Sequence, residues 1–80
     1  MPTVVRVGKF VVVIYLDDHP PAHVHVRFDG ASVRVLIAKE TVTLDVIEGK
    51  VSRADERRAL EVVADHLELC LKAWEKHHDK

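Results

Sequence analysis

The chain has 80 residues, of which 48% are hydrophobic and 31% charged, and its formal net charge is −1. This composition is typical of one small globular domain over residues 1–80 and excludes a disordered chain. The near-zero charge gives no overall sign of nucleic-acid binding and leaves a local basic patch open. The single cysteine, Cys70, excludes an intramolecular disulfide. Because the start lacks a signal-peptide pattern and no apolar run reaches membrane-spanning length, we expect a cytoplasmic protein without membrane contact.

The first part of the chain predicts about five short antiparallel strands between residues 3 and 46. Gly8-Lys9 and Lys39-Glu40 each separate two apolar runs as a two-residue hairpin turn would, and Asp29-Gly30 predicts a type I′ turn. The turn at Gly8-Lys9 places Val7 opposite Phe10, Val5 opposite Val12 and Val4 opposite Val13. The predicted strands cover residues 3–7, 10–16, 23–28, 31–37 and 41–46.

The last part of the chain predicts one long helix over about residues 53–76. Ser52 is a favourable N-cap, and at ~100° per residue the apolar positions from Ala59 to Trp74 cover an arc of roughly 200°. The sequence therefore predicts an α+β fold, in which an antiparallel meander of about five short strands carries this helix on one face. Both the wide apolar arc and the apolar Val11 and Val13 on the opposite sheet face favour a partner surface, for a second copy or another protein. The alternative is a helix wrapped deeply into a curved sheet.

Three of the six histidines lie in the block Asp18-His19-Pro20-Pro21-Ala22-His23-Val24-His25-Val26. His23 and His25 are two apart on a predicted strand and project from one face, and His19 could join them from the loop. Three such imidazoles suit a divalent transition metal, but Arg27 on the same face and Arg34 opposite His25 disfavour a bound cation. Without a metal, the same histidines suit general acid–base chemistry on a phosphodiester.

The residues around this block fit RNA as the substrate. Arginines can hold a phosphate and an aromatic ring can stack on a base, so Tyr15, Asp18, Arg27 and Arg34 are the candidate binding residues. His19, His23 and His25 are the candidate catalytic residues, or the metal ligands in the alternative interpretation. An ordinary solvated sheet face explains the same charges, because Arg34 also lies opposite Asp45 in the predicted pairing.

Two further residues of the helix are better explained by packing than by chemistry. His66 lies within the apolar arc, where a core histidine with one satisfied hydrogen bond is expected. Cys70 is expected to be a small buried hydrophobic residue, since nothing in the sequence identifies a base for it.

The histidine block, the opening Met1-Pro2-Thr3-Val4-Val5-Arg6-Val7-Gly8 and a helix beginning near Arg57-Arg58-Ala59-Leu60 resemble a family of small bacterial proteins, domain-of-unknown-function family 4160. The family has proline where this chain has Ala22, and often asparagine where it has Asp17. The resemblance implies a toxin-like component of a toxin–antitoxin pair. It also implies a small antitoxin-like protein partner.

These observations lead to one hypothesis and two alternatives. The hypothesis is a small cytoplasmic toxin-like protein that acts on RNA without a cofactor, through its histidines, and is held in check by a protein partner. The first alternative is a non-enzymatic module that binds a metal or another ligand at the histidines. The second is a protein–protein adaptor, and a homodimer is open in every case.

Overall fold

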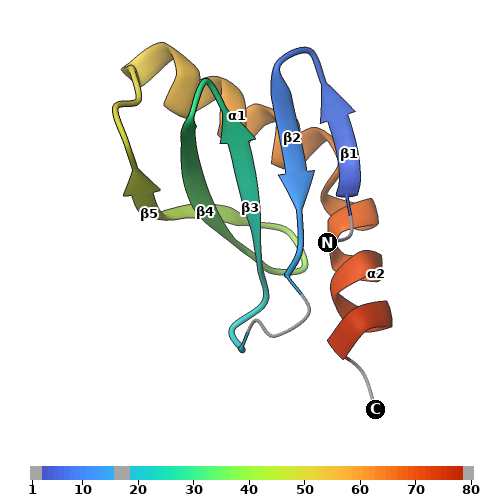
Figure 1. Cartoon of the computed structure of the whole chain (residues 1–80). Helices are drawn as coiled ribbons and strands as arrows, with labels where there is room; N and C mark the ends of the chain where they lie inside the picture. The colour runs from blue at the N-terminus through green and yellow to red at the C-terminus, as the bar shows by residue number, and fades with distance from the viewer. Residues whose placement is uncertain (1–2, 16–18, 79–80) are drawn as a thin grey trace.

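The computed structural model describes residues 3–15 and 19–78, apart from the side chain of His78. Five strands form one antiparallel meander in the order β1-β2-β3-β4-β5, as predicted, and the helices lie on one face of it (Figure 1). The elements are β1 (Thr3–Val7), β2 (Phe10–Val13), β3 (His23–Phe28), β4 (Ala31–Ile37), β5 (Val42–Glu48), α1 (Arg53–Asp65) and α2 (Leu67–His78).

The hairpin turns set the strand register. Asp29 and Gly30 both have positive φ, 49° and 74°, which is the type I′ geometry that Asp-Gly predicts. Val7 pairs with Phe10 and Val5 with Val12, as predicted, but Thr3 rather than Val4 pairs with Val13 because the register shifts between Thr3 and Val5. This irregularity at Val4 is a β-bulge, which sequence alternation does not reveal.

The core lies between the sheet and the two helices. α1 contacts β2, β4 and β5, and α2 contacts β1 and β4. Burial follows the predicted alternation along all of β4 and from Val24 to Phe28 in β3, whereas His23 at the start of β3 is buried although it shares a face with His25. The buried apolar residues of this core are Phe10, Val12, Ile14, Val24, Val26, Phe28, Val33, Val35, Ile37, Ala59, Val62, Val63 and Cys70.

The prediction of one long C-terminal helix is wrong, because the helix is interrupted at His66. The His66 backbone N–H bonds the carbonyl of Val63, at 3.1 Å, instead of continuing the helical pattern. The His66 ring Nδ1 lies 2.9 Å from the Val62 carbonyl, the group that its own backbone N–H would bond in a continuous helix. The side chain competes with the backbone for this acceptor, and a new helix begins at Leu67. Neither helix, over the residues described, is long and apolar enough to cross a membrane.

Lys9, at the tip of the β1–β2 hairpin, connects three elements. Its Nζ lies 2.6 Å from an oxygen of Asp29, in the β3–β4 turn, and 3.2 Å from an oxygen of Asp55, in the first turn of α1. The same ammonium lies 5.6 Å from the ring centroid of Phe10 and 5.7 Å from that of Phe28. The hydrogen bond to Asp29 contributes most to raising the pKa of Lys9 above its ordinary value.

Candidate active site

The sheet face opposite the helices presents its side chains in cross-strand rows. Directly opposite residues of antiparallel strands point to the same face, so the pairing of His25 with Arg34 is a contact of this face, as predicted. Val13 also lies in this row but is only 2% exposed, so it adds little to any outer surface. One row contains Val13, His25, Arg34 and Val46, and the next contains Arg6, Val11, Arg27, Ser32 and Glu48.

Four aromatic rings follow one another from α2 to this face and form what we call the ring row. Trp74 and His23 have ring centroids 5.2 Å apart, and His23 and His25 have centroids 5.1 Å apart with an interplanar angle of 77°. His25 in turn meets Tyr15 at 4.5 Å and 62°. Tilted and edge-to-face arrangements of this kind are the favoured geometries of aromatic pairs. The two strand histidines are therefore brought together and held between larger rings.

His23 is the one buried polar residue of the described chain, at 5% exposure. Its Nδ1 lies 2.9 Å from the carbonyl oxygen of Pro21. A carbonyl can only accept, so Nδ1 carries the hydrogen and donates it. The neutral ring then has its lone pair on Nε2, which is the atom able to take a proton. The bond to Pro21 therefore fixes both the orientation and the tautomer of His23.

A hollow of about 610 Å³ lies beside His23 at this end of the sheet, and we call it the histidine hollow. It brings together two imidazoles, those of His19 and His23, and one guanidinium, that of Arg34. Arg34 donates from Nε to an oxygen of Asp45 at 2.7 Å. The predicted pairing of these two residues is wrong, however, because the register shifts between Arg34 and Val35 and Arg34 pairs with Val46. The lining residues are His19, Pro20, Pro21, His23, Arg34, Leu36 and Asp45.

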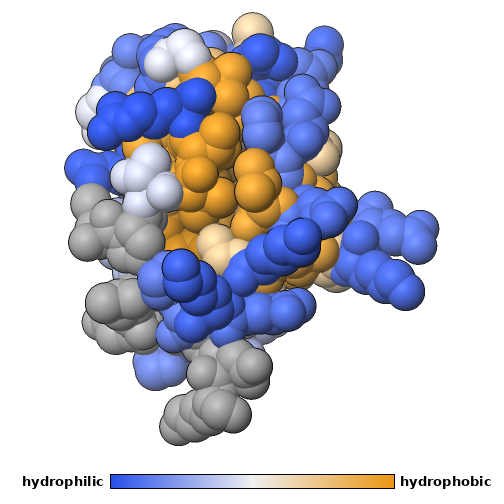
Figure 2. Space-filling model, turned by 90° about the vertical axis from the view of Figure 1, so that its right-hand side faces the viewer, coloured by the Kyte–Doolittle hydropathy of each residue, from blue (hydrophilic) through white to orange (hydrophobic). Residues whose placement is uncertain are grey.

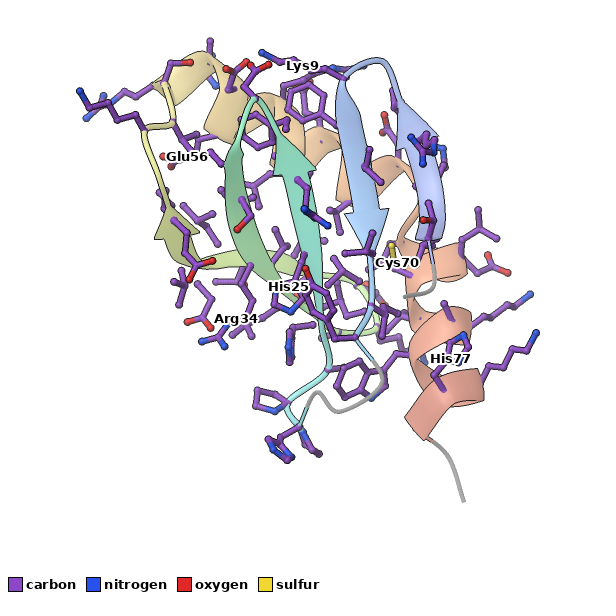
Figure 3. The ribbon with its side chains drawn as sticks, viewed as in Figure 1. Lys9, His25, Arg34, Glu56, Cys70 and His77 are labelled. Carbon is purple, nitrogen blue, oxygen red and sulfur yellow. The ribbon has the colours of Figure 1, made fainter. Side chains whose placement is uncertain are left out.

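The remaining predicted site residues lie around this hollow or away from it. His25 lines a smaller cavity of about 70 Å³ together with Arg34, and both lie toward the lower end of the sheet in Figure 3. Tyr15 is half-buried against His25, and together with the exposed Arg27 it lines a separate, wider hollow of about 710 Å³. Asp18 lies outside the described residues.

The geometry gives the metal interpretation no additional support. Over residues 3–15 and 19–78, no group of three histidine, cysteine, aspartate or glutamate side chains is placed to hold a metal ion. Metal binding at His19, His23 and His25 stays a prediction.

The family described as "Domain of unknown function (DUF4160)" matches residues 10–75, which is most of the chain. The chain belongs to this family. No curated protein and no solved structure matches it. The DUF4160 match includes all four residues of the ring row and every lining residue of the histidine hollow, whereas β1 precedes it.

Two contacts of this DUF4160 site are not foreseen from the sequence. Trp74 is recognisable as an anchor at the end of the helical apolar stripe, but no local pattern places its ring against His23. The contact of His23 with the Pro21 carbonyl cannot be predicted from the sequence either, because it depends on the path of the loop. Both contacts come from tertiary packing, and both act on the same histidine.

Cys70 and His66 occupy structural positions in the DUF4160 fold, as predicted. Cys70 is fully buried, and burial raises the pKa of its thiol from 9.0 to about 11. A thiol with so little thiolate at neutral pH is a poor nucleophile. His66 is half-buried and hydrogen-bonded to the Val62 carbonyl.

Proposed function

We propose that this protein is a small toxin-like component of a two-protein pair that cleaves RNA at the histidine hollow. The observation that carries the proposal is the hydrogen bond from His23 Nδ1 to the Pro21 carbonyl, at 2.9 Å, in a hollow that also holds His19 and Arg34. A base in a fixed tautomer, a second imidazole and a fixed cation are what metal-independent phosphodiester cleavage requires. The toxin-like part of the proposal comes from the family resemblance alone.

Each residue has a role in the proposed reaction. His23 Nε2 accepts the proton of a ribose 2′-hydroxyl while its oxygen attacks the neighbouring phosphorus atom. The bond from phosphorus to the 5′-oxygen breaks, and protonated His19 gives that oxygen its proton. The products are a 2′,3′-cyclic phosphate and a free 5′-hydroxyl, and no oxidant or metal takes part. Arg34, held by Asp45 at 2.7 Å, neutralises the charge that develops on the phosphate oxygens.

The other candidate residues support this centre. His25 packs edge-on against His23 and restrains its ring. Tyr15 and Arg27 both line the wider hollow of about 710 Å³, where a ring can stack on a base and a guanidinium can bind the next phosphate. Binding of RNA across this face would therefore weaken as salt rises, because phosphate contacts release counterions.

The test uses the purified protein and a single-stranded RNA oligonucleotide labelled at both ends, in buffer containing EDTA. His19→Ala removes the exposed acid. His23→Asn keeps a donor where Nδ1 lies and removes the base at Nε2, so the bond to Pro21 survives. We expect each variant to lower the cleavage rate by at least about 100-fold. His77→Ala on α2, labelled in Figure 3, is the matched control and should leave the rate unchanged.

Two results would refute the proposal. One is wild-type protein that leaves the RNA intact over the whole pH range in which imidazole titrates. The other is cleavage that both hollow variants retain in full, which would point to a contaminating nuclease. A substrate with 2′-deoxyribose at the cleaved position should stay intact, because it lacks the attacking hydroxyl. Thermal unfolding of each variant checks that a loss of cleavage is not a loss of fold.

A further inference from the structure

β1 is one of the two edge strands of the sheet. β1 stands at the end of the strand order and pairs only with β2 among the described strands. Val4, Val5 and Val7 are half-buried and pack against the core, while Arg6 is exposed on the other face. Unpaired strand edges bind other strands unless charge, proline or a bulge prevents it, and the described strand Thr3–Val7 has one bulge and one arginine.

α2 extends this edge into a wider apolar surface. α2 contacts β1, and its Leu67 and Leu71 are half-buried against the same core. Figure 2 views the molecule from the side on which β1 and α2 lie, and a continuous apolar band runs down that side between polar margins. We call this surface, made by Val4, Val5, Val7, Leu67 and Leu71, the β1 edge surface. It offers the backbone N–H and C=O groups of the β1 edge for hydrogen bonding, together with apolar contacts on the helix side.

The opposite edge of the sheet differs in charge. Two acidic residues of β5 are already engaged with β4: Asp45 accepts from Arg34 at 2.7 Å and Glu48 accepts from Ser32 at 3.1 Å. β5 is also irregular, because its register with β4 shifts between Arg34 and Val35. Both edge strands therefore carry charge and a bulge, which are the usual protection of an edge, but the sign of the charge differs: β1 presents Arg6, whereas β5 presents Asp45 and Glu48. An added strand with acidic side chains suits β1 rather than β5.

A second copy of the chain is a poor occupant of the β1 edge surface. The regular part of β1 runs from Val5 to Val7, so a two-fold axis at its centre would set Arg6 opposite Arg6 of the other copy, and like charges directly opposite are destabilising. A two-fold axis at Val5 would instead set Arg6 opposite the bulged Val4. Pairing of β1 with β5 of another copy leaves free edges at both ends and does not close.

We propose that the β1 edge surface binds an extended segment of a different protein, which adds to the sheet as a sixth, antiparallel strand. In the bound segment, alternate residues are apolar and lie on the helix side, next to Val5 and Val7. On the other face, an acidic residue of the segment lies beside Arg6. Strand addition gains affinity from main-chain hydrogen bonds and specificity from alternate side chains. The inference goes beyond the proposed function, because it uses none of the residues that line the histidine hollow.

The test measures the binding of a labelled peptide of about nine residues that alternates valine and glutamate, by fluorescence anisotropy. A second peptide carries lysine in place of glutamate. We expect wild-type protein to bind the glutamate peptide about tenfold more tightly than the lysine peptide, because Arg6 attracts glutamate and repels lysine. Arg6→Glu should reverse this preference, whereas Arg57→Glu on α1, an exposed charge of the same type, should preserve it.

Further arms separate strand addition from other outcomes. N-methylation of alternate peptide amides should abolish binding, because it removes the ladder donors without changing the side chains. The proposal is overturned by no saturable binding of the glutamate peptide, by binding that methylation leaves intact, or by wild-type self-association in sedimentation that Arg6→Glu relieves. His23→Asn should bind the peptide as wild type does, so failure here and failure of the cleavage proposal can be told apart.

Discussion

Raising the pH above about 9 should destabilise the protein through Cys70. The thiol is fully buried, and burial raises its pKa from 9.0 to about 11. Below about pH 9 the thiol is protonated in both the folded and the unfolded chain, and it contributes no pH dependence. Above that pH the unfolded thiol loses its proton first, so the unfolded chain binds fewer protons and the free energy of unfolding falls. The fall ends near pH 11, where the folded thiol also ionises.

The size of the effect follows from the two pKa values of Cys70. One pKa unit corresponds to about 1.4 kcal/mol, so at about pH 10.5 the free energy of unfolding should be lower by on the order of 2 kcal/mol. A domain of this size has roughly 3–5 kcal/mol of stability from its core. Ionisation of this one thiol should therefore remove a large share of the total.

Urea unfolding followed by the emission of Trp74, the single tryptophan, measures this free energy at a series of pH values. The informative quantity is the difference between wild type and Cys70→Ala, because every other ionisable group is the same in the two proteins. The wild-type curve should fall more steeply above about pH 9. Parallel curves for the two proteins would refute the reasoning, because they would mean that the folded thiol ionises as easily as the unfolded one.

Lys9→Met should lower stability by removing the contacts to Asp29 and Asp55, and the difference from wild type in urea unfolding should shrink as NaCl is raised. A difference that is constant with salt would assign the loss to packing. Gly49→Ala should cost on the order of 2 kcal/mol, because its φ is +91° and the new Cβ would lie 3.0 Å from another Cβ. Gly8→Ala, at φ +57° with no atom within 4 Å of the new Cβ, should cost only about 1 kcal/mol. Equal losses of stability in the two variants would show that the close contact at Gly49 has no effect.

The sheet could be predicted because hairpins are local. Asp29-Gly30 determines the turn type, the turn determines the register, and the register places His25 opposite Arg34. The interruption of the helix could not be predicted in this way. It depends on the His66 ring taking the Val62 carbonyl from the His66 backbone N–H, a competition between two donors for one acceptor that apolar periodicity does not describe.

The candidate site was predictable in its members but not in their environments. Alternation along β3 correctly puts His23 and His25 side by side, with ring centroids 5.1 Å apart. It cannot indicate that His23 is buried, because the residues that bury and orient it, Trp74 and Pro21, reach it through the fold. That burial turns a solvent-facing imidazole into one with a fixed tautomer, and this is the basis of the role proposed for it.

The contact between β1 and α2 has a consequence for how the protein is made. The first strand and the last helix are neighbours, so their contact closes a loop that spans nearly the whole sequence. During synthesis β1 leaves the ribosome long before α2 does, and in that interval its valines lack their helical neighbour. Contacts of such high sequence separation also form late in folding. Until α2 is made, the nascent chain is therefore open at β1 to capture by chaperones or to mispairing with another chain.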